Sequence, residues 1–260
     1  MARIFITGSS DGLGCLAAQQ LIKNGHKVTL HARNEQRAKD AEKACPGAEG
    51  VLIGDLSSMA QTKQLAESAN KTGAFDCVIH NAGIHRGGFR KTDEGVPSLV
   101  AVNVLAPYIL TCLMHRPKRL VFVSSDCHYN GDGSDESVDD IAWKKRGEKR
   151  WSDGQAYGDS KLYDNMLANA FSRRWPDVKS NSFHPGWVKT NMGGPGATDS
   201  AEAGIDTYVM LAEGEGKGAE TGNFFYPDKK EEEPLPVAMD EKAQEKLMTA
   251  CEAITGVSPP

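Results

Sequence analysis

Short apolar strands alternate with longer helical stretches along this chain, and this alternation constrains its fold more than any other feature. The strand-like segments lie at residues 4–7, 28–30, 51–53, 77–79, 120–123, 180–183 and 222–226. Helical spacing of apolar residues covers residues 13–24, 34–45, 57–71, 96–114, 156–174, 201–211 and 240–254. We expect Pro107 to kink or divide the fourth of these helices. This order predicts an α/β fold, with a doubly wound parallel sheet of about seven strands and helices on both faces.

Composition excludes several other classes of protein. The 260 residues show no internal repeat and no linker, so we expect one domain over residues 1–260. A formal net charge of −5 offers no positive field for nucleic acid. No apolar run approaches the roughly 18 residues that a membrane span needs, and the N-terminus lacks a signal-peptide pattern. The six cysteines show no CxxC spacing, which argues against a zinc site and favours a cytoplasmic protein.

A glycine-rich turn follows the first strand. Residues 7–14 read TGSSDGLG and lead directly into a helix. Glycines allow a tight turn and close approach, while the N–H groups at the start of the helix attract a phosphate. The turn therefore predicts a dinucleotide site, although a plain βα turn is the alternative. Its spacing, Gly-x-x-x-Gly-x-Gly, is one residue longer than the common fingerprint.

Further motifs follow the later strands in a fixed order. They are NAG at residues 81–83, SS at 124–125, YGDSK at 157–161 and PG at 185–186. Together with the glycine turn, these motifs resemble the short-chain dehydrogenase/reductase family over residues 3–192. The resemblance implies a single Rossmann-type domain that transfers hydride between a nicotinamide cofactor and a carbonyl or alcohol.

Tyr157 and Lys161 are the expected proton-transfer pair, because residues i and i+4 share one face of a helix. A free phenol has a pKa of about 10, and a nearby ammonium lowers that pKa. The resemblance gives Tyr157 the proton transfer, Ser125 a hydrogen bond to the same substrate oxygen, and Lys161 a contact with the nicotinamide ribose. Asn103 matches the asparagine that completes the tetrad and fixes a water, or it is a polar residue inside a helix.

The end of the second strand indicates which cofactor binds. In NAD-users the family usually has an acidic residue at the position of Ala32, where it binds the ribose 2′-OH. Arg33 instead offers a guanidinium suited to a 2′-phosphate, so NADP(H) is favoured over NAD(H). Asp11 departs from the pattern, because many NADP-users have a basic residue there. Asp55 matches the aspartate at the adenine amino group, or it is a helix N-terminal acid.

The expected site therefore has a catalytic group, a larger cofactor group and no metal. The catalytic residues are Asn103, Ser125, Tyr157 and Lys161. The cofactor-binding residues are Gly8, Ser9, Ser10, Gly12, Leu13, Gly14, Arg33, Asp55, Leu56, Asn81, Ala82, Gly83, Tyr157, Lys161, Pro185, Gly186, Val188 and Thr190.

Two stretches do not fit the alternation of strands and helices. An insertion at about residues 127–154 separates Ser125 from Tyr157, and a substrate loop rich in glycine covers about residues 190–200. The insertion is similar to that of the retinol dehydrogenase and WW-domain oxidoreductase branch. It is either a solvated segment with its own ion pairs or a lid whose Trp143 or Trp151 meets an apolar substrate.

These features predict an NADP(H)-dependent oxidoreductase acting on a small, apolar carbonyl or alcohol. The alternative is a catalytically silent NADP(H)-binding regulator or scaffold, which would be expected to lose the tyrosine or the lysine. Nucleotide-sugar epimerase chemistry would need a longer substrate domain than the short tail after Pro185. The sequence leaves the oligomeric state open, and a homo-oligomer is one possibility because members of the family often associate through helices that flank the active site.

Overall fold

Eight strands form one sheet in the order β3-β2-β1-β4-β5-β6-β7-β8. The computed structural model, which describes residues 1–259, gives their bounds. They are β1 (Arg3–Ile6), β2 (Lys27–Ala32), β3 (Gly50–Ile53), β4 (Cys77–His80), β5 (Arg119–Val123), β6 (Lys179–Phe183), β7 (Phe224–Phe225) and β8 (Glu231–Glu232). All neighbouring pairs are parallel except β7 and β8, so the predicted doubly wound sheet is confirmed, with an additional short antiparallel edge strand.

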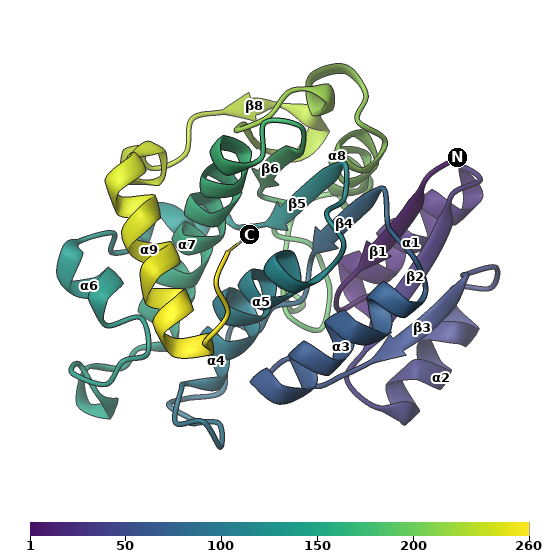
Figure 1. Cartoon of the computed structure of the whole chain (residues 1–260). Helices are drawn as coiled ribbons and strands as arrows, with labels where there is room; N and C mark the ends of the chain where they lie inside the picture. Colours follow the sequence, from purple (N-terminus) through teal and green to yellow (C-terminus); the bar gives the residue numbers. More distant parts are fainter. Residues whose placement is uncertain (260) are drawn as a thin grey trace.

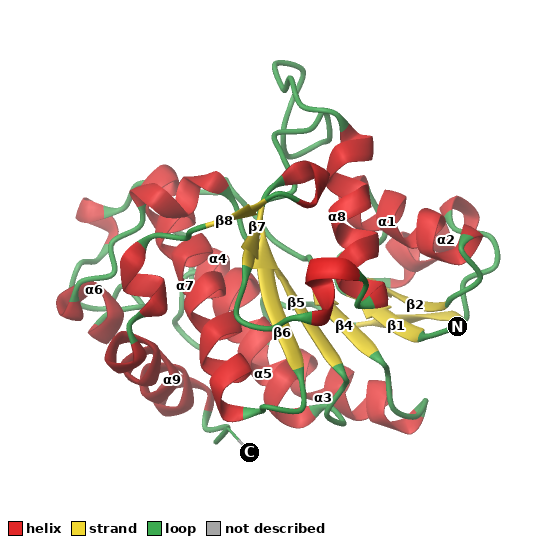
Figure 2. Cartoon of the chain, turned by 90° about the horizontal axis from the view of Figure 1, so that it is seen from above, coloured by secondary structure: helices red, strands yellow, loops and turns green. Residues whose placement is uncertain are grey.

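Helices cover both faces of this sheet (Figure 1 and Figure 2). One face carries α1 (Gly12–Lys23), α2 (Glu35–Ala44) and α8 (Ala201–Glu213). The other carries α3 (Met59–Lys71), α5 (Ala106–Leu113) and α7 (Asp153–Arg174), with α9 (Glu241–Thr255) packed outside α7. Within residues 1–259, no helix combines the length and the apolar character that a membrane crossing requires.

Local sequence signals explain where several helices begin. The side chain of Asn34 accepts a hydrogen bond from the backbone N–H of Arg37, at 3.0 Å, at the start of α2. Ser58 caps α3 in the same way through the N–H of Gln61. Such caps satisfy N–H groups that have no partner within the helix. The helix starts expected near residues 34 and 57 are therefore confirmed within one or two residues.

The core consists of two apolar clusters, one on each face of the sheet. Successive side chains of β1 alternate between them, since Phe5 belongs to one cluster and Ile4 and Ile6 belong to the other. All three residues are fully buried. Full burial of one such side chain contributes roughly 1.5–3 kcal/mol, so the alternation fixes which face each helix covers.

The helical stretch at residues 96–114 is not one continuous α-helix. It contains α4 (Ser98–Val100), a π-helical turn η1 (Ala101–Leu105) and then α5. Pro107 lies in the first turn of α5, directly after the π turn, and it has no N–H to donate to that turn. The expected division next to Pro107 is therefore present, and it takes the form of a π turn. Such turns are frequent at functional sites.

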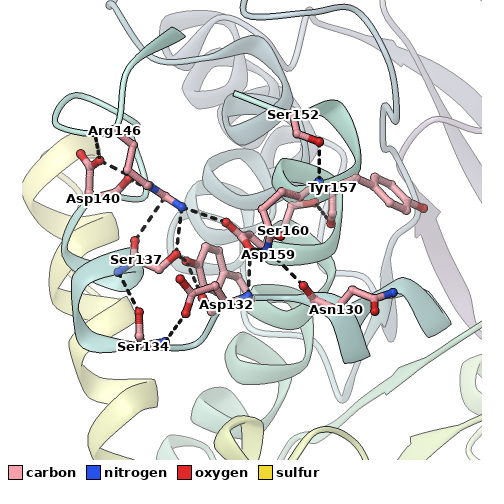
Figure 3. Close-up of polar contacts among 12 residues, drawn as sticks. Asn130, Asp132, Ser134, Ser137, Asp140, Arg146, Ser152, Tyr157, Asp159 and Ser160 are labelled. Atoms are coloured by element: carbon pink, nitrogen blue, oxygen red, sulfur yellow. Dashed lines mark hydrogen bonds and ion pairs between the residues drawn. The ribbon is translucent and has the colours of Figure 1, made fainter. Parts of the chain in front are cut away.

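Part of the insertion at residues 127–154 packs against α7 (Figure 3), and the rest is exposed to solvent. It contains the short helix α6 (Asp135–Asp139). The guanidinium of Arg146 donates to Asp159 of α7 at 3.1 Å and lies 3.5 Å from the carboxylate of Asp140. Trp143 is 2% exposed and packs edge-on against Trp151. Neither tryptophan lines the central cleft, so neither makes the substrate contact that the lid alternative expects. The ion pair of Arg146 with Asp140 lies within the insertion, as the other alternative expects.

Candidate active site

A cleft of about 1070 Å³ runs along the carboxyl ends of the parallel strands. It includes the point between β1 and β4 where the strand order reverses, which is where doubly wound folds bind ligands. Of the expected site residues, all line this cleft except Ser9 and Asn103. Most motifs far apart in the sequence thus meet because they follow the ends of strands, and α7 brings Tyr157 and Lys161 to the same edge.

The glycine turn is held against the NAG motif. Gly8 has a φ of +63°, and a Cβ there would lie 2.8 Å from the Cα of Ala82. A Cβ on Gly14 would lie 2.3 Å from the side-chain nitrogen of Asn81. That nitrogen donates to the carbonyls of Thr7 and Gly8. Larger residues at Gly8 or Gly14 would therefore displace the turn and the N–H groups at the start of α1.

Ser9 has a different position from the one expected. Its hydroxyl donates to the carbonyl of Ile6 at 2.9 Å and accepts from the N–H of His31, and the residue is fully buried. Ser9 therefore supports the turn from inside and does not reach the cleft. The glycine-rich motif does not reveal that Ser9 is buried, because a serine in a loop is expected to be exposed.

His31 is a supporting residue that the sequence analysis missed. Its Nδ1 accepts from the N–H of Gly8 at 2.9 Å, and its Nε2 donates to the carbonyl of Gly54 at 2.9 Å. Burial lowers the pKa of His31, which keeps the imidazole neutral and able to do both. One side chain thereby joins the ends of three strands beneath the cofactor end of the cleft.

Two arginines lie at the end of the cleft beyond β2. Arg33 follows the strand, and Arg37 lies in the first turn of α2. Arg37 was missed by the sequence analysis, although its spacing of four from Arg33 is a usable signal. Its guanidinium lies 3.3 Å from the carboxylate of Asp11, which also accepts from the side chain of Asn191. The charge of Asp11 is thus offset by neighbouring side chains.

Asp55 stabilises the turn that precedes α3. Its carboxylate accepts hydrogen bonds from the N–H and the hydroxyl of Ser57, at 2.9 and 2.7 Å. The residue also lines the cleft. Both alternatives for Asp55, a structural acid and a group that faces the cofactor, are therefore compatible with its position.

Ser125, Tyr157 and Lys161 come together at the opposite end of the cleft. The Lys161 nitrogen lies 5.7 Å from the centre of the Tyr157 ring. Burial raises the pKa of Tyr157 and outweighs the lowering by Lys161 and by a hydrogen bond with Ser125. Tyr157 therefore keeps its proton at neutral pH, whereas the Tyr–Lys spacing alone suggested a lowered pKa.

Asn103 lies in the π turn η1 and is buried away from the cleft. Its side-chain oxygen accepts from the N–H of Ile84, and its nitrogen donates to the carbonyl of Ile84 and to the hydroxyl of Ser160. The side chain therefore joins the segment after the NAG motif to α7. The side-chain oxygen of Asn103 and the Lys161 nitrogen both lie close to Gly83, because a Cβ on that residue would be 3.6 Å from each.

The substrate side of the cleft contains residues that no motif identified. The ring of His85 lies 4.4 Å from that of Tyr157, centre to centre. Trp187 and Met192 lie on the loop after β6 and are 51% and 47% exposed. They line the cleft together with Leu99 and Val102. This side of the cleft is therefore partly apolar, and two of these four apolar residues lie on an exposed loop.

Comparison with known proteins identifies the family. A sequence profile described as short chain dehydrogenase matches residues 2–128. Short-chain dehydrogenase chyC of Penicillium rubens is 51% identical, and the alignment covers 100% of both chains. Short-chain dehydrogenase chry4 of Gibberella zeae is 48% identical over 100% of this chain and 99% of its own. Retinol dehydrogenase 14 of Homo sapiens is 29% identical over 98% and 86%, respectively, in line with the resemblance to that branch.

Solved structures share the fold. A crystal structure from Mycobacterium paratuberculosis superposes with a TM-score of 0.82 at 24% identity, covering 100% of this chain and 95% of that chain. NADPH-bound carbonyl reductase from chicken fatty liver superposes with a TM-score of 0.66 at 20% identity, covering 88% and 98%. The chain therefore belongs to the short-chain dehydrogenase/reductase family, whose members are oxidoreductases that bind a nicotinamide cofactor and act on small molecules.

Proposed function

We propose that this protein is an NADP(H)-dependent oxidoreductase that interconverts a carbonyl and an alcohol, with Tyr157 as the general acid and base. The observation that carries the proposal is the meeting of Ser125, Tyr157 and Lys161 in one cleft, where burial raises the pKa of the Tyr157 phenol. A general acid must hold its proton before the reaction, so this raised pKa suits reduction at neutral pH.

Some residues of the cleft would bind the cofactor, and others would take part in proton transfer to the substrate. The glycine turn and the start of α1 would hold the pyrophosphate, and Thr190 would contact the nicotinamide carboxamide. A bound nicotinamide supplies or accepts the hydride. In reduction, Tyr157 donates its proton to the substrate oxygen while Ser125 donates a hydrogen bond to the same atom. The ammonium of Lys161 stabilises the phenolate that remains.

The preference for NADP(H) rests on the arginines beyond β2. Arg33 and Arg37 both line that end of the cleft, and a guanidinium binds a phosphate through paired hydrogen bonds. Asp11 would oppose a 2′-phosphate, but Arg37 and Asn191 offset its charge. The apolar side chains of Leu99, Val102, Trp187 and Met192 favour an apolar substrate.

The first experiment compares the wild-type protein with Tyr157→Phe. The wild type is assayed for NADPH oxidation over a panel of aldehydes, ketones and quinones. The variant is expected to lose roughly 10²–10⁴-fold or more in kcat, because proton transfer contributes that much. NADPH affinity should change little. Substantial turnover by the variant would refute the mechanism, and NADPH binding without any turnover across the panel would favour a silent regulator.

A further inference from the structure

Lys161 has a carboxylate partner that the family motifs do not include. On α7, one turn after the lysine, the carboxylate oxygen of Asp164 lies 2.8 Å from the Lys161 nitrogen. The same nitrogen donates to the carbonyl of Val123 at the end of β5, at 2.7 Å. The side chains of Lys161 and Asp164 are only 5% and 3% exposed. The ammonium is thus held between a strand end and a buried carboxylate.

Burial makes this pair different from a surface ion pair. It raises the pKa of Asp164 to about 6, so the carboxylate is mostly ionised at neutral pH. Burial alone lowers the pKa of Lys161, but Asp164 and Tyr157 outweigh it and hold that pKa above its usual value. A buried lysine without a counter-charge loses its proton much more easily.

Two other ionisable groups act on Lys161, Tyr157 on α7 and Cys127 after β5, and neither carries a charge near neutral pH. His85 after β4 and Tyr208 on α8 interact with Tyr157 and are also uncharged. Burial raises the pKa values of Tyr157, Cys127 and Tyr208, and burial with the adjacent Arg86 lowers that of His85. Among these groups the counter-charge to Lys161 therefore comes from Asp164.

We propose that Asp164 is a positioning residue that keeps Lys161 charged and so sets the pH above which the Tyr157–Lys161 pair loses its proton. This inference rests on the proposed proton-transfer role of Tyr157. Reduction needs the phenol and the ammonium together. Without the carboxylate the net charge of the site is more positive by one unit, so the Tyr157 phenol and the Lys161 ammonium each release a proton at a lower pH.

The first test is the pH dependence of carbonyl reduction by Asp164→Asn. The amide keeps the shape and removes the charge. The alkaline limb of kcat/KM is expected to move to lower pH by about 1–3 units, the range that an opposite charge at this distance produces. A merely structural role would lower activity at every pH and leave the limb in place.

A matched control is Asp140→Asn, which removes another buried carboxylate paired with a cation. Asp140 lies in the insertion, 3.5 Å from the guanidinium of Arg146, and does not line the cleft. Its variant should be less stable but should keep the alkaline limb of the wild type. A similar shift in both variants would contradict the proposal.

The second test uses protein without cofactor or substrate and measures melting temperature against pH. In the wild type the pKa of Lys161 is higher in the folded than in the unfolded protein. The charged lysine therefore stabilises the fold fully at pH values below its unfolded pKa, and this contribution is lost as pH rises through its folded pKa. In Asp164→Asn burial should bring the folded pKa below the unfolded value, so stability rises with pH between the two. The gap in melting temperature between wild type and Asp164→Asn should therefore narrow from about pH 8 to pH 10, where the unfolded lysine is still charged.

For Asp140→Asn the gap should stay constant over the same range, because arginine keeps its charge throughout. An unmoved alkaline limb or a constant gap for Asp164→Asn would overturn the inference. If instead Tyr157→Phe keeps its activity, the proton-transfer role fails on its own. The melting temperatures then still decide whether Asp164 keeps Lys161 charged.

Discussion

The two ends of the cleft use charge in different ways. At the cofactor end, Arg37 and Asp11 form a pair whose side chains are 38% and 45% exposed. At the catalytic end, Lys161 and Asp164 form a pair with almost no exposure. Exposed ion pairs contribute little to the free energy of unfolding and are screened by salt. A buried charge that loses its partner strongly destabilises the folded protein. The charges at the cofactor end can therefore be altered at little cost in stability, whereas altering the charges at the catalytic end should destabilise the protein.

The largest effect should come from breaking the buried ion pair of the insertion with Arg146→Met. This change leaves Asp140 and Asp159 buried without their cation, which should cost about 3–5 kcal/mol of unfolding free energy. Urea unfolding measures the loss. Lys118→Met is the matched exposed variant, since Lys118 pairs with Asp76 but its side chain is 76% exposed. It should cost at most about 1 kcal/mol, and equal losses would remove the distinction between the two kinds of pair.

A smaller effect, on binding alone, should follow from Arg33→Ala. A hydrogen bond to a charged group contributes about 1.5–3 kcal/mol, so NADPH affinity should fall roughly 10- to 150-fold. NADH affinity should stay nearly unchanged, because NADH lacks the 2′-phosphate. Fluorescence titration with both cofactors measures the two affinities. Equal losses for NADPH and NADH, or equal affinities in the wild type, would show that Arg33 does not select the cofactor.

The smallest effect should come from Asp11→Asn. Because Arg37 and Asn191 already offset the carboxylate, NADPH affinity should rise by no more than about fivefold, the limit for an exposed pair. The gain should shrink as salt is added. The same titration at low and high salt tests this. A gain well above tenfold would mean that Asp11 faces the 2′-phosphate directly and that the pairing described above does not hold in solution.

Local signals made much of this molecule predictable from its sequence. Strand ends, the glycine turn and the caps at Asn34 and Ser58 depend on residues close together in the chain. Because all motifs except YGDSK directly follow a strand, the parallel sheet brings them to one edge, and so the cleft could be anticipated. The edge strand β8 could not, since two glutamates carry no strand pattern.

Properties that depend on burial could not be predicted in this way. The pKa of Tyr157 depends on how completely other elements cover it, which the Tyr–Lys spacing does not record. Ser9 and Asn103 read as polar residues of a loop and a helix, but each is buried and used internally. Arg146 also pairs with Asp159 of α7, outside the insertion, and the charge pattern within the insertion could not show this contact.

The cover over α7 has a consequence for how the protein is made. Asn169 donates to the carbonyl of Ala238, and Arg173 binds Gln244, so α7 is joined to α9 and the segment before it. Tyr108 of α5 likewise donates to the carbonyl of Val257. The helix that carries Tyr157 and Lys161 thus emerges from the ribosome well before its cover. Its apolar outer side must wait, exposed to solvent or to a chaperone, until α9 has been synthesised.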